Sequence, residues 1–182
     1  SDRGSDRGNR EPIRINRATQ LSSQFSLTTD SIDSNGFFDP RYTCDFDNSS
    51  PELRWSNAPL GTQGYVLIAE DPDAPTGLFT HWIVYNIPEH VHHLPAGIPA
   101  QETLPNGIRQ GVNSFGKLGY GGPCPPSGDR AHRYVFRVHA LRARPELTSR
   151  ATREQVLAAI ETHSLAVAEL TGRYQRQVQK AG

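Results

Sequence analysis

The stretch RYVFRVHAL, from Arg133 to Leu141, is the clearest secondary-structure signal in this chain of 182 residues. Side chains alternate between the two faces of an extended strand, so every second residue shares a face. One face of this segment is entirely apolar and comprises Tyr134, Phe136, Val138 and Ala140. The other face carries Val135, Arg137 and His139. The pattern predicts a strand that packs one face against a core.

Working outward from this strand, the remaining pattern is also mainly β. Tyr65 to Ala69 is a continuous apolar run, which is typical of a strand covered on both faces, and His81 to Ile87 is another. Shorter strands are expected at Gln24 to Leu27 and at Leu53 to Trp55. Residues 88–128 are rich in proline and are expected to be mostly loop.

One helix is expected, late in the chain. Thr152 and Gln155 have the spacing of a capping box, which marks a helix start. Apolar or weakly polar residues then recur every three or four positions: Val156, Ile160, His163, Val167 and Leu170. Gly172 is a suitable end, and residues 173–178 are a candidate for a last strand. Several strands with one late helix predict a mainly β fold with the helix at its edge.

Composition limits the domain organisation and the classes of partner. Residues 1–20 are nearly devoid of apolar side chains and predict a flexible polar tail, which leaves 21–182 as a single domain. Lys plus Arg and Asp plus Glu both number 19, so nucleic acid is not an expected partner. No apolar run approaches the ~20 residues of a transmembrane segment. We therefore expect a soluble protein, either cytoplasmic or exported with its signal removed.

Two segments beside the apolar strands carry the first candidate chemistry. Asp71-Pro72-Asp73-Ala74-Pro75 follows a strand directly, and residues two apart in extended chain point to the same side. Asp71 and Asp73 are thus expected to present both carboxylates together. The alternative is an ordinary turn in which Asp caps its own backbone. His81 opens the next strand, where a hydrogen-bonded structural role is the alternative to ligand contact.

A glycine-rich loop and two cysteines complete the candidate set. Gly119 to Pro126 reads GYGGPCPP, and glycines there allow close approach of backbone N–H groups to an anion. A stiff loop without a ligand is the alternative. His132 and Tyr134 follow and share one strand face. From spacing alone, Cys44 and Cys124 are either two unpaired thiols or one disulfide.

Taken together, these segments resemble the phosphatidylethanolamine-binding family, which includes the Raf kinase inhibitor proteins, and specifically its bacterial and archaeal branch. The matching motifs are Ser50 to Trp55, Asp71 to Gly77, His81-Trp82, Asn113 to Lys117, Gly119 to Pro126 and His132 to Tyr134. The resemblance implies a central antiparallel sheet, a smaller second sheet and a few peripheral helices. By position, it places a ligand pocket at Asp71, Asp73, Pro75, His81, Gly122, Pro123, His132 and Tyr134.

The resemblance also implies a function. It predicts a non-enzymatic binding protein that holds a phosphate-like anion or a phospholipid head group and needs no cofactor. Modulation of a kinase or protease, and a homodimer, are associations that it allows. A metal-dependent hydrolase using the Asp/His cluster is the alternative, because two Asp and two His can ligate zinc. A third option is an enzyme with Cys124 as nucleophile near His132, although flanking prolines favour a buried or bridged cysteine.

Two structural expectations follow from the same resemblance. Cys44 and Cys124 lie in loops that match one branch of the family, and we predict that they are close enough to form a disulfide. Similar proteins carry a cis proline in the Asp71 to Pro75 motif. We therefore predict a cis peptide bond between Ala74 and Pro75, which proline makes accessible.

Overall fold

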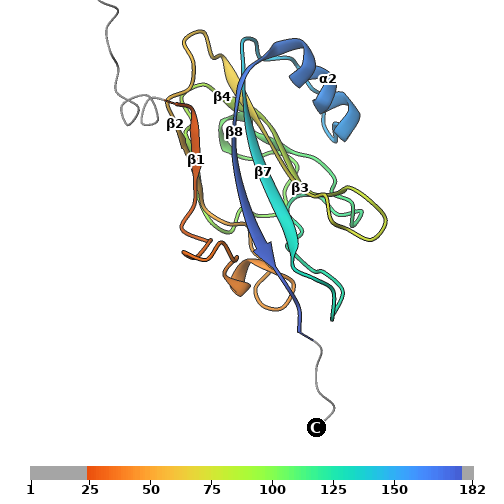
Figure 1. Cartoon of the computed structure of the whole chain (residues 1–182). Helices are drawn as coiled ribbons and strands as arrows, with labels where there is room; N and C mark the ends of the chain where they lie inside the picture. The colour runs from red at the N-terminus through yellow and green to blue at the C-terminus, as the bar shows by residue number, and fades with distance from the viewer. Residues whose placement is uncertain (1–23, 178–182) are drawn as a thin grey trace, which may run out of the picture.

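The computed structural model describes residues 24–177, which form two antiparallel sheets and one α-helix (Figure 1). The predicted tail, residues 1–20, lies outside the described residues. The larger sheet has the strand order β6-β4-β3-β7-β8, and the smaller has the order β1-β2-β5. The mainly β fold with a second, smaller sheet is therefore confirmed.

The strands of the small sheet are β1 (Ser26–Thr28), β2 (Leu53–Ser56) and β5 (His93–Leu94). Those of the large sheet are β3 (Gly64–Asp71), β4 (Phe79–Pro88), β6 (Arg109–Gln110), β7 (His132–Leu141) and β8 (Ser164–Tyr174). The helix is α2 (Arg153–His163), and two 3-10 turns are η2 (Pro40–Tyr42) and η3 (Pro105–Gly107). Between residues 88 and 128 only short elements occur, as expected of a loop region.

The large sheet is the middle layer of the molecule. All eight residues of β3 are buried, which confirms the prediction for the apolar run Tyr65 to Ala69. One face packs on the small sheet through side chains such as Trp55, Leu67 and Phe136. The other face packs against α2 through side chains such as Val66, Ile68 and Ile83. Figure 1 shows α2 and the small sheet on opposite sides of β7 and β8.

The alternation predicted for β7 is confirmed. Tyr134, Phe136, Val138 and Ala140 all belong to the core between the two sheets. β7 pairs with β3 on one side and β8 on the other, so it is an interior strand. None of the helices within residues 24–177 is long and apolar enough to cross a membrane.

The predicted helix is too long, and residues 164–172 form a strand instead. The capping box of Thr152 and Gln155 is present, but α2 ends at His163, and Ser164 adopts an extended conformation. β8 then pairs with β7 from Ser164 through to Tyr174. Tertiary pairing with a long interior strand outweighs the weak helical period. The predicted last strand at residues 173–178 thus begins much earlier and ends at Tyr174.

Candidate functional site

A pocket of about 220 Å³ lies at one end of the large sheet. β3 ends there, and its two antiparallel neighbours β4 and β7 begin there, because antiparallel pairing brings opposite strand ends together. Asp71, His81 and His132 therefore converge although the sequence separates them. The lining consists of Asp71, Ala74, Pro75, Thr76, Phe79, His81, Phe115, Cys124, Pro125, Pro126, His132 and Tyr134.

The pocket brings together five of the eight residues predicted from the sequence. These are Asp71, Pro75, His81, His132 and Tyr134. The other three, Asp73, Gly122 and Pro123, are not among the lining residues. Their side chains or backbone groups have protein partners elsewhere, described below.

His132 is held between two carboxylates. Its Nδ1 lies 2.7 Å from Oδ2 of Asp71, and its Nε2 lies 3.2 Å from Oδ2 of Asp129. Burial opposes the charged imidazole, but the hydrogen bonds to Asp71 and Asp129 outweigh it and raise the pKa of His132. The protonated form donates from both ring nitrogens, which matches two carboxylate acceptors.

His81 differs from His132 in its protonation state. Its Nδ1 lies 2.6 Å from the Gly121 carbonyl oxygen, so Nδ1 carries the hydrogen. Burial lowers the pKa of His81, against the opposing influence of Gly121 and Asp71. The neutral ring therefore presents Nε2 as an acceptor. Phe79 and Phe115 flank the ring at centroid distances of 5.0 and 5.5 Å.

Tyr134, one of the lining residues of the pocket, carries an unsatisfied polar group. Its hydroxyl is buried and has no hydrogen-bond partner within residues 24–177. Burial and the nearby charge of Asp71 raise the pKa of Tyr134, so the hydroxyl stays protonated. The ring stands edge-on to His81 at 5.2 Å. A buried donor without an acceptor is uncommon in proteins and calls for an explanation.

Asp73 does not face the pocket beside Asp71, contrary to expectation. The chain turns after Asp71, whose Oδ1 accepts from the Asp73 backbone N–H at 2.7 Å. The period of an extended strand no longer applies across such a turn. The Asp73 carboxylate instead pairs with Arg133, with Oδ1–Nη2 and Oδ2–Nε distances of 2.8 and 2.9 Å. Hydrogen bonds from Arg133 lower the pKa of Asp73 to about 2.

The cis peptide bond predicted between Ala74 and Pro75 is wrong. No peptide bond within the described residues is cis. The turn closes without one, because the Ala74 carbonyl accepts from the Gly77 N–H at 3.0 Å. Gly77 has φ of 104°, a left-handed conformation that glycine adopts without strain.

The backbone of the glycine-rich loop is occupied by protein contacts. The Gly122 N–H donates to Asn48 Oδ1 at 2.8 Å, and the Gly121 N–H donates to the His81 carbonyl at 2.9 Å. A Cβ on Gly122 would overlap the Tyr42 carbonyl oxygen. Glycine is thus needed here for the close approach of two loops, rather than to expose N–H groups to an anion.

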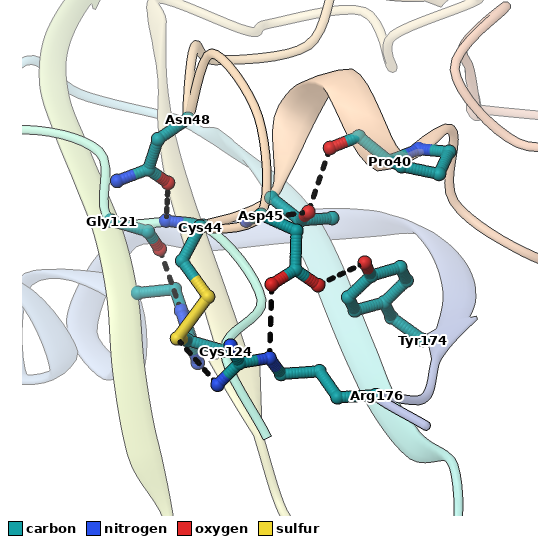
Figure 2. Close-up of a disulfide and its surroundings, with 11 residues drawn as sticks. Pro40, Cys44, Asp45, Asn48, Gly121, Cys124, Tyr174 and Arg176 are labelled. Carbon is teal, nitrogen blue, oxygen red and sulfur yellow. Dashed lines mark hydrogen bonds and ion pairs between the residues drawn. A yellow bond between two sulfur atoms is a disulfide. The ribbon is translucent and has the colours of Figure 1, made fainter. Parts of the chain in front are cut away.

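Cys44 and Cys124 form a disulfide with their Cα atoms 5.4 Å apart, which confirms the predicted proximity (Figure 2). It joins the loop after η2 to the loop that lines the pocket. The Pro123 carbonyl accepts from the Cys44 N–H at 3.1 Å beside it. Asp45 pairs with Arg176 at 3.0 Å and accepts from the Tyr174 hydroxyl. Since Cys124 carries no free thiol, the pairing argues against a cysteine nucleophile.

Three contributors were missed from the sequence. Phe79 and Phe115 stack edge-on at 4.7 Å and form the apolar wall around His81. Asp129 contacts His132. The only sequence feature that could have indicated this contact is that Asp129 lies three residues before His132. Within residues 24–177, no group of three or more His, Cys, Asp or Glu side chains converges to hold a metal ion.

The fold and the pocket define a class: a two-sheet β protein with a His/Asp pocket where β3 ends and β4 and β7 begin. The chain belongs to the phosphatidylethanolamine-binding protein family, whose model matches residues 28–175.

Relatives in both archaea and bacteria support this assignment. A protein of Methanothermobacter thermautotrophicus, named only as a UPF0098 protein, is 44% identical over 151 residues, covering 83% of this chain and 99% of the relative. The crystal structure of Escherichia coli YbcL, described as a new member of the mammalian PEBP family, superposes with a TM-score of 0.77 and 34% identity. It covers 84% of this chain and 99% of YbcL. A putative homologue from Chlamydia trachomatis gives a TM-score of 0.76 and 36% identity, with coverages of 85% and 99%.

Proposed function

We propose that this protein binds a phosphate-like anion, free or as a phospholipid head group, in the pocket where β3 ends, without chemical turnover. The observation that carries the proposal is the buried Tyr134 hydroxyl, which has no partner within residues 24–177 and belongs to a pocket wall shared with His81 and His132. An anion oxygen would satisfy that donor.

The charges around the pocket set the terms of binding. His132 lies between the carboxyl groups of Asp71 and Asp129, which raise its pKa and favour the charged ring, whereas burial lowers the pKa of His81 and favours the neutral ring. A bare anion is therefore repelled unless His81 Nε2 takes up a proton. A head group that carries an ammonium as well as a phosphate would offset one carboxylate, so O-phosphoethanolamine should bind better than inorganic phosphate.

The absence of turnover is part of the proposal. Asp73 is paired with Arg133, so the two carboxylates and two imidazoles do not meet as one ligand set for a metal-dependent hydrolase. Modulation of a kinase or protease remains a prediction from the family resemblance. The exposed side chains Leu78 and Phe115, one of them in the pocket wall, offer an apolar surface for such a contact. The homodimer also remains a prediction.

The test is calorimetric titration of phosphate and O-phosphoethanolamine into the wild type and Tyr134→Phe. Losing one hydrogen bond to a charged group should weaken binding by roughly one to two decades. Because the hydroxyl has no protein partner, the variant should unfold at the same temperature as the wild type or higher. Tyr65→Phe is the matched control, since its hydroxyl donates to the Glu89 carbonyl away from the pocket. Equal affinity in all three proteins, or steady hydrolysis of a phosphate monoester, would contradict the proposal.

A further inference from the structure

The hydrogen bond between His132 Nε2 and Asp129 joins a lining residue of the candidate pocket to a carboxylate next to that pocket. His132 lines both the pocket and a neighbouring depression formed by Asp73, Asp129, Arg130 and Ala131. The Asp129 Oδ2 atom lies 3.2 Å from Nε2, at the position where an oxygen of a bound anion would accept a hydrogen bond.

The two carboxylates on His132 are held very differently. The Asp71 side chain is 4% exposed and lies 2.7 Å from Nδ1, so it is fixed in the wall. The Asp129 side chain is 41% exposed and belongs to the loop before β7. Its longer hydrogen bond to Nε2 competes with water, which makes exposed pairs weak. Asp129 is therefore the carboxylate that a ligand can displace.

Asp73 cannot take this role. Its carboxylate receives the Arg133 backbone N–H and two guanidinium hydrogens, and it makes no contact with a ring nitrogen of His132. Asp71 cannot leave without stranding the buried imidazole of His132 without its carboxylate partner, which is costly. Of the three carboxylates in contact with His132 or its neighbour Arg133, only Asp129 combines exposure with a contact to a ring nitrogen.

We infer that Asp129 is an internal competitor for the anion site: its carboxylate occupies His132 Nε2 in the free protein and is displaced when an anion binds. The inference rests on the proposed function and specifies its regulation and selectivity. Asp129 weakens the binding of a bare phosphate twice, by occupying the donor and by repelling the anion. Once displaced, it remains at the mouth and can accept from an ammonium on the ligand, so it favours zwitterionic ligands over plain anions.

Removing Asp129 has one effect that opposes tighter anion binding. Asp129 also helps to keep His132 protonated, so its removal reduces the positive charge available to an anion. Asp71 retains its buried hydrogen bond to Nδ1 and continues to favour the charged ring. Titrations at pH 6, below the ordinary pKa of histidine near ~6.5, keep this loss small.

The experiment compares wild type, Asp129→Ala and a control, Asp30→Ala, by calorimetric titration with inorganic phosphate and O-phosphoethanolamine. Asp30 pairs with Arg54 on the small sheet and is 78% exposed, so its removal changes net charge equally without touching the pocket. Asp129→Ala should bind phosphate about 5- to 10-fold tighter, the scale of a weak charged pair plus relieved repulsion. Its preference for O-phosphoethanolamine should shrink, and Asp30→Ala should match the wild type.

The same titrations distinguish failure of the Asp129 inference from failure of the proposed binding function. If the wild type binds phosphate and Asp129→Ala binds it no tighter, the inference is overturned while the binding function stands. Phosphate binding by Asp129→Ala alone would support a strong internal competitor. If neither protein binds either ligand, both the inference and the proposed function fail.

Discussion

Asp71 Oδ2 lies 2.7 Å from His132 Nδ1, and both side chains are almost fully buried. This pair ties the last residue of β3 to the first residue of β7 across the floor of the candidate site. A buried charge that loses its partner is strongly destabilising. The pair therefore links the stability of the sheet end to the protonation of one imidazole.

Asp71→Asn should lower the free energy of unfolding by about 2–3 kcal/mol at pH 6, the cost of a hydrogen bond to a charged group. The pKa of His132 is raised in the folded protein, so its stabilising effect is complete below its unfolded pKa near ~6.5. The effect is lost as pH rises through the folded value. Urea unfolding at pH 6 and pH 9 measures the free energy of unfolding of both proteins. The difference between wild type and variant should be smaller at pH 9 than at pH 6. A difference that grows with pH would refute this role.

Asp73→Asn should leave phosphate affinity within about twofold of the wild type, because its carboxylate faces Arg133 and not the pocket. Its Arg133 partner is half exposed, so the loss of stability at neutral pH should also be small. The measurement is calorimetry beside urea unfolding. A tenfold change in affinity would place the Asp73 carboxylate in the site after all.

Local patterns predicted those parts of the fold that local physics controls. The apolar alternation of β7 and the unbroken apolar run of β3 were confirmed because one strand packs its apolar face on the core and the other is covered on both faces. The capping box at Thr152 and Gln155 was also confirmed, since its hydrogen bonds are made within one turn. Four of the five pocket residues that converge lie near strand ends and the fifth, Pro75, lies in the turn between β3 and β4; the family resemblance located all five.

Features that depend on distant partners were not predicted. Val167 and Leu170 continue the helical spacing of Ile160 and His163, yet pairing with β7 makes that segment a strand. The direction of the Asp73 carboxylate depends on Arg133, sixty residues later. Neither partner is visible in the local sequence, so neither outcome follows from periodicity or turn preference alone.

Gly172→Ala tests the corrected strand. Gly172 is buried in β8 opposite Tyr134, and a Cβ there would overlap the ring of Phe38. Overpacking of this kind should destabilise the protein by about 1–3 kcal/mol. Thr171→Ala, an exposed neighbour in the same strand, is the control and should change stability by less than about 0.5 kcal/mol. Equal unfolding midpoints in urea for the two variants would argue against the packing of Phe38 on β8.

The disulfide should contribute a large share of stability. It closes a sequence separation of 80 residues, for which the chain-entropy model gives about 4.5 kcal/mol as an upper value. The double variant Cys44→Ser, Cys124→Ser should therefore unfold at lower urea concentration than the oxidised wild type. Reductant should move the wild type to the position of the double variant and leave the double variant unchanged. A wild type whose unfolding is insensitive to reductant under conditions that expose the disulfide would contradict this expectation.

Anion binding should be coupled to the uptake of a proton by His81. In the free protein His81 donates from Nδ1 to Gly121, and burial lowers its pKa, so Nε2 is an unprotonated acceptor at neutral pH. An anion at Nε2 favours the charged ring and must therefore draw a proton from solvent. Hydrogen bonds to Asp71 and Asp129 raise the pKa of His132, so its proton uptake belongs to a higher pH range than that of His81. Inorganic sulfate is the suitable probe because it does not itself titrate near neutrality.

Sulfate affinity should rise as pH falls from 7.5 to 5.5, by at most about tenfold per pH unit for a single coupled proton. Calorimetry in two buffers of different ionisation enthalpy should measure uptake of a fraction of one proton at pH 7.5. His81→Asn should bind weakly with a flattened pH dependence, whereas His90→Asn, at an exposed position outside the pocket lining, should behave as the wild type. A wild-type affinity that is independent of pH, or a His81→Asn profile that matches the wild type, would show that the anion does not contact His81 Nε2.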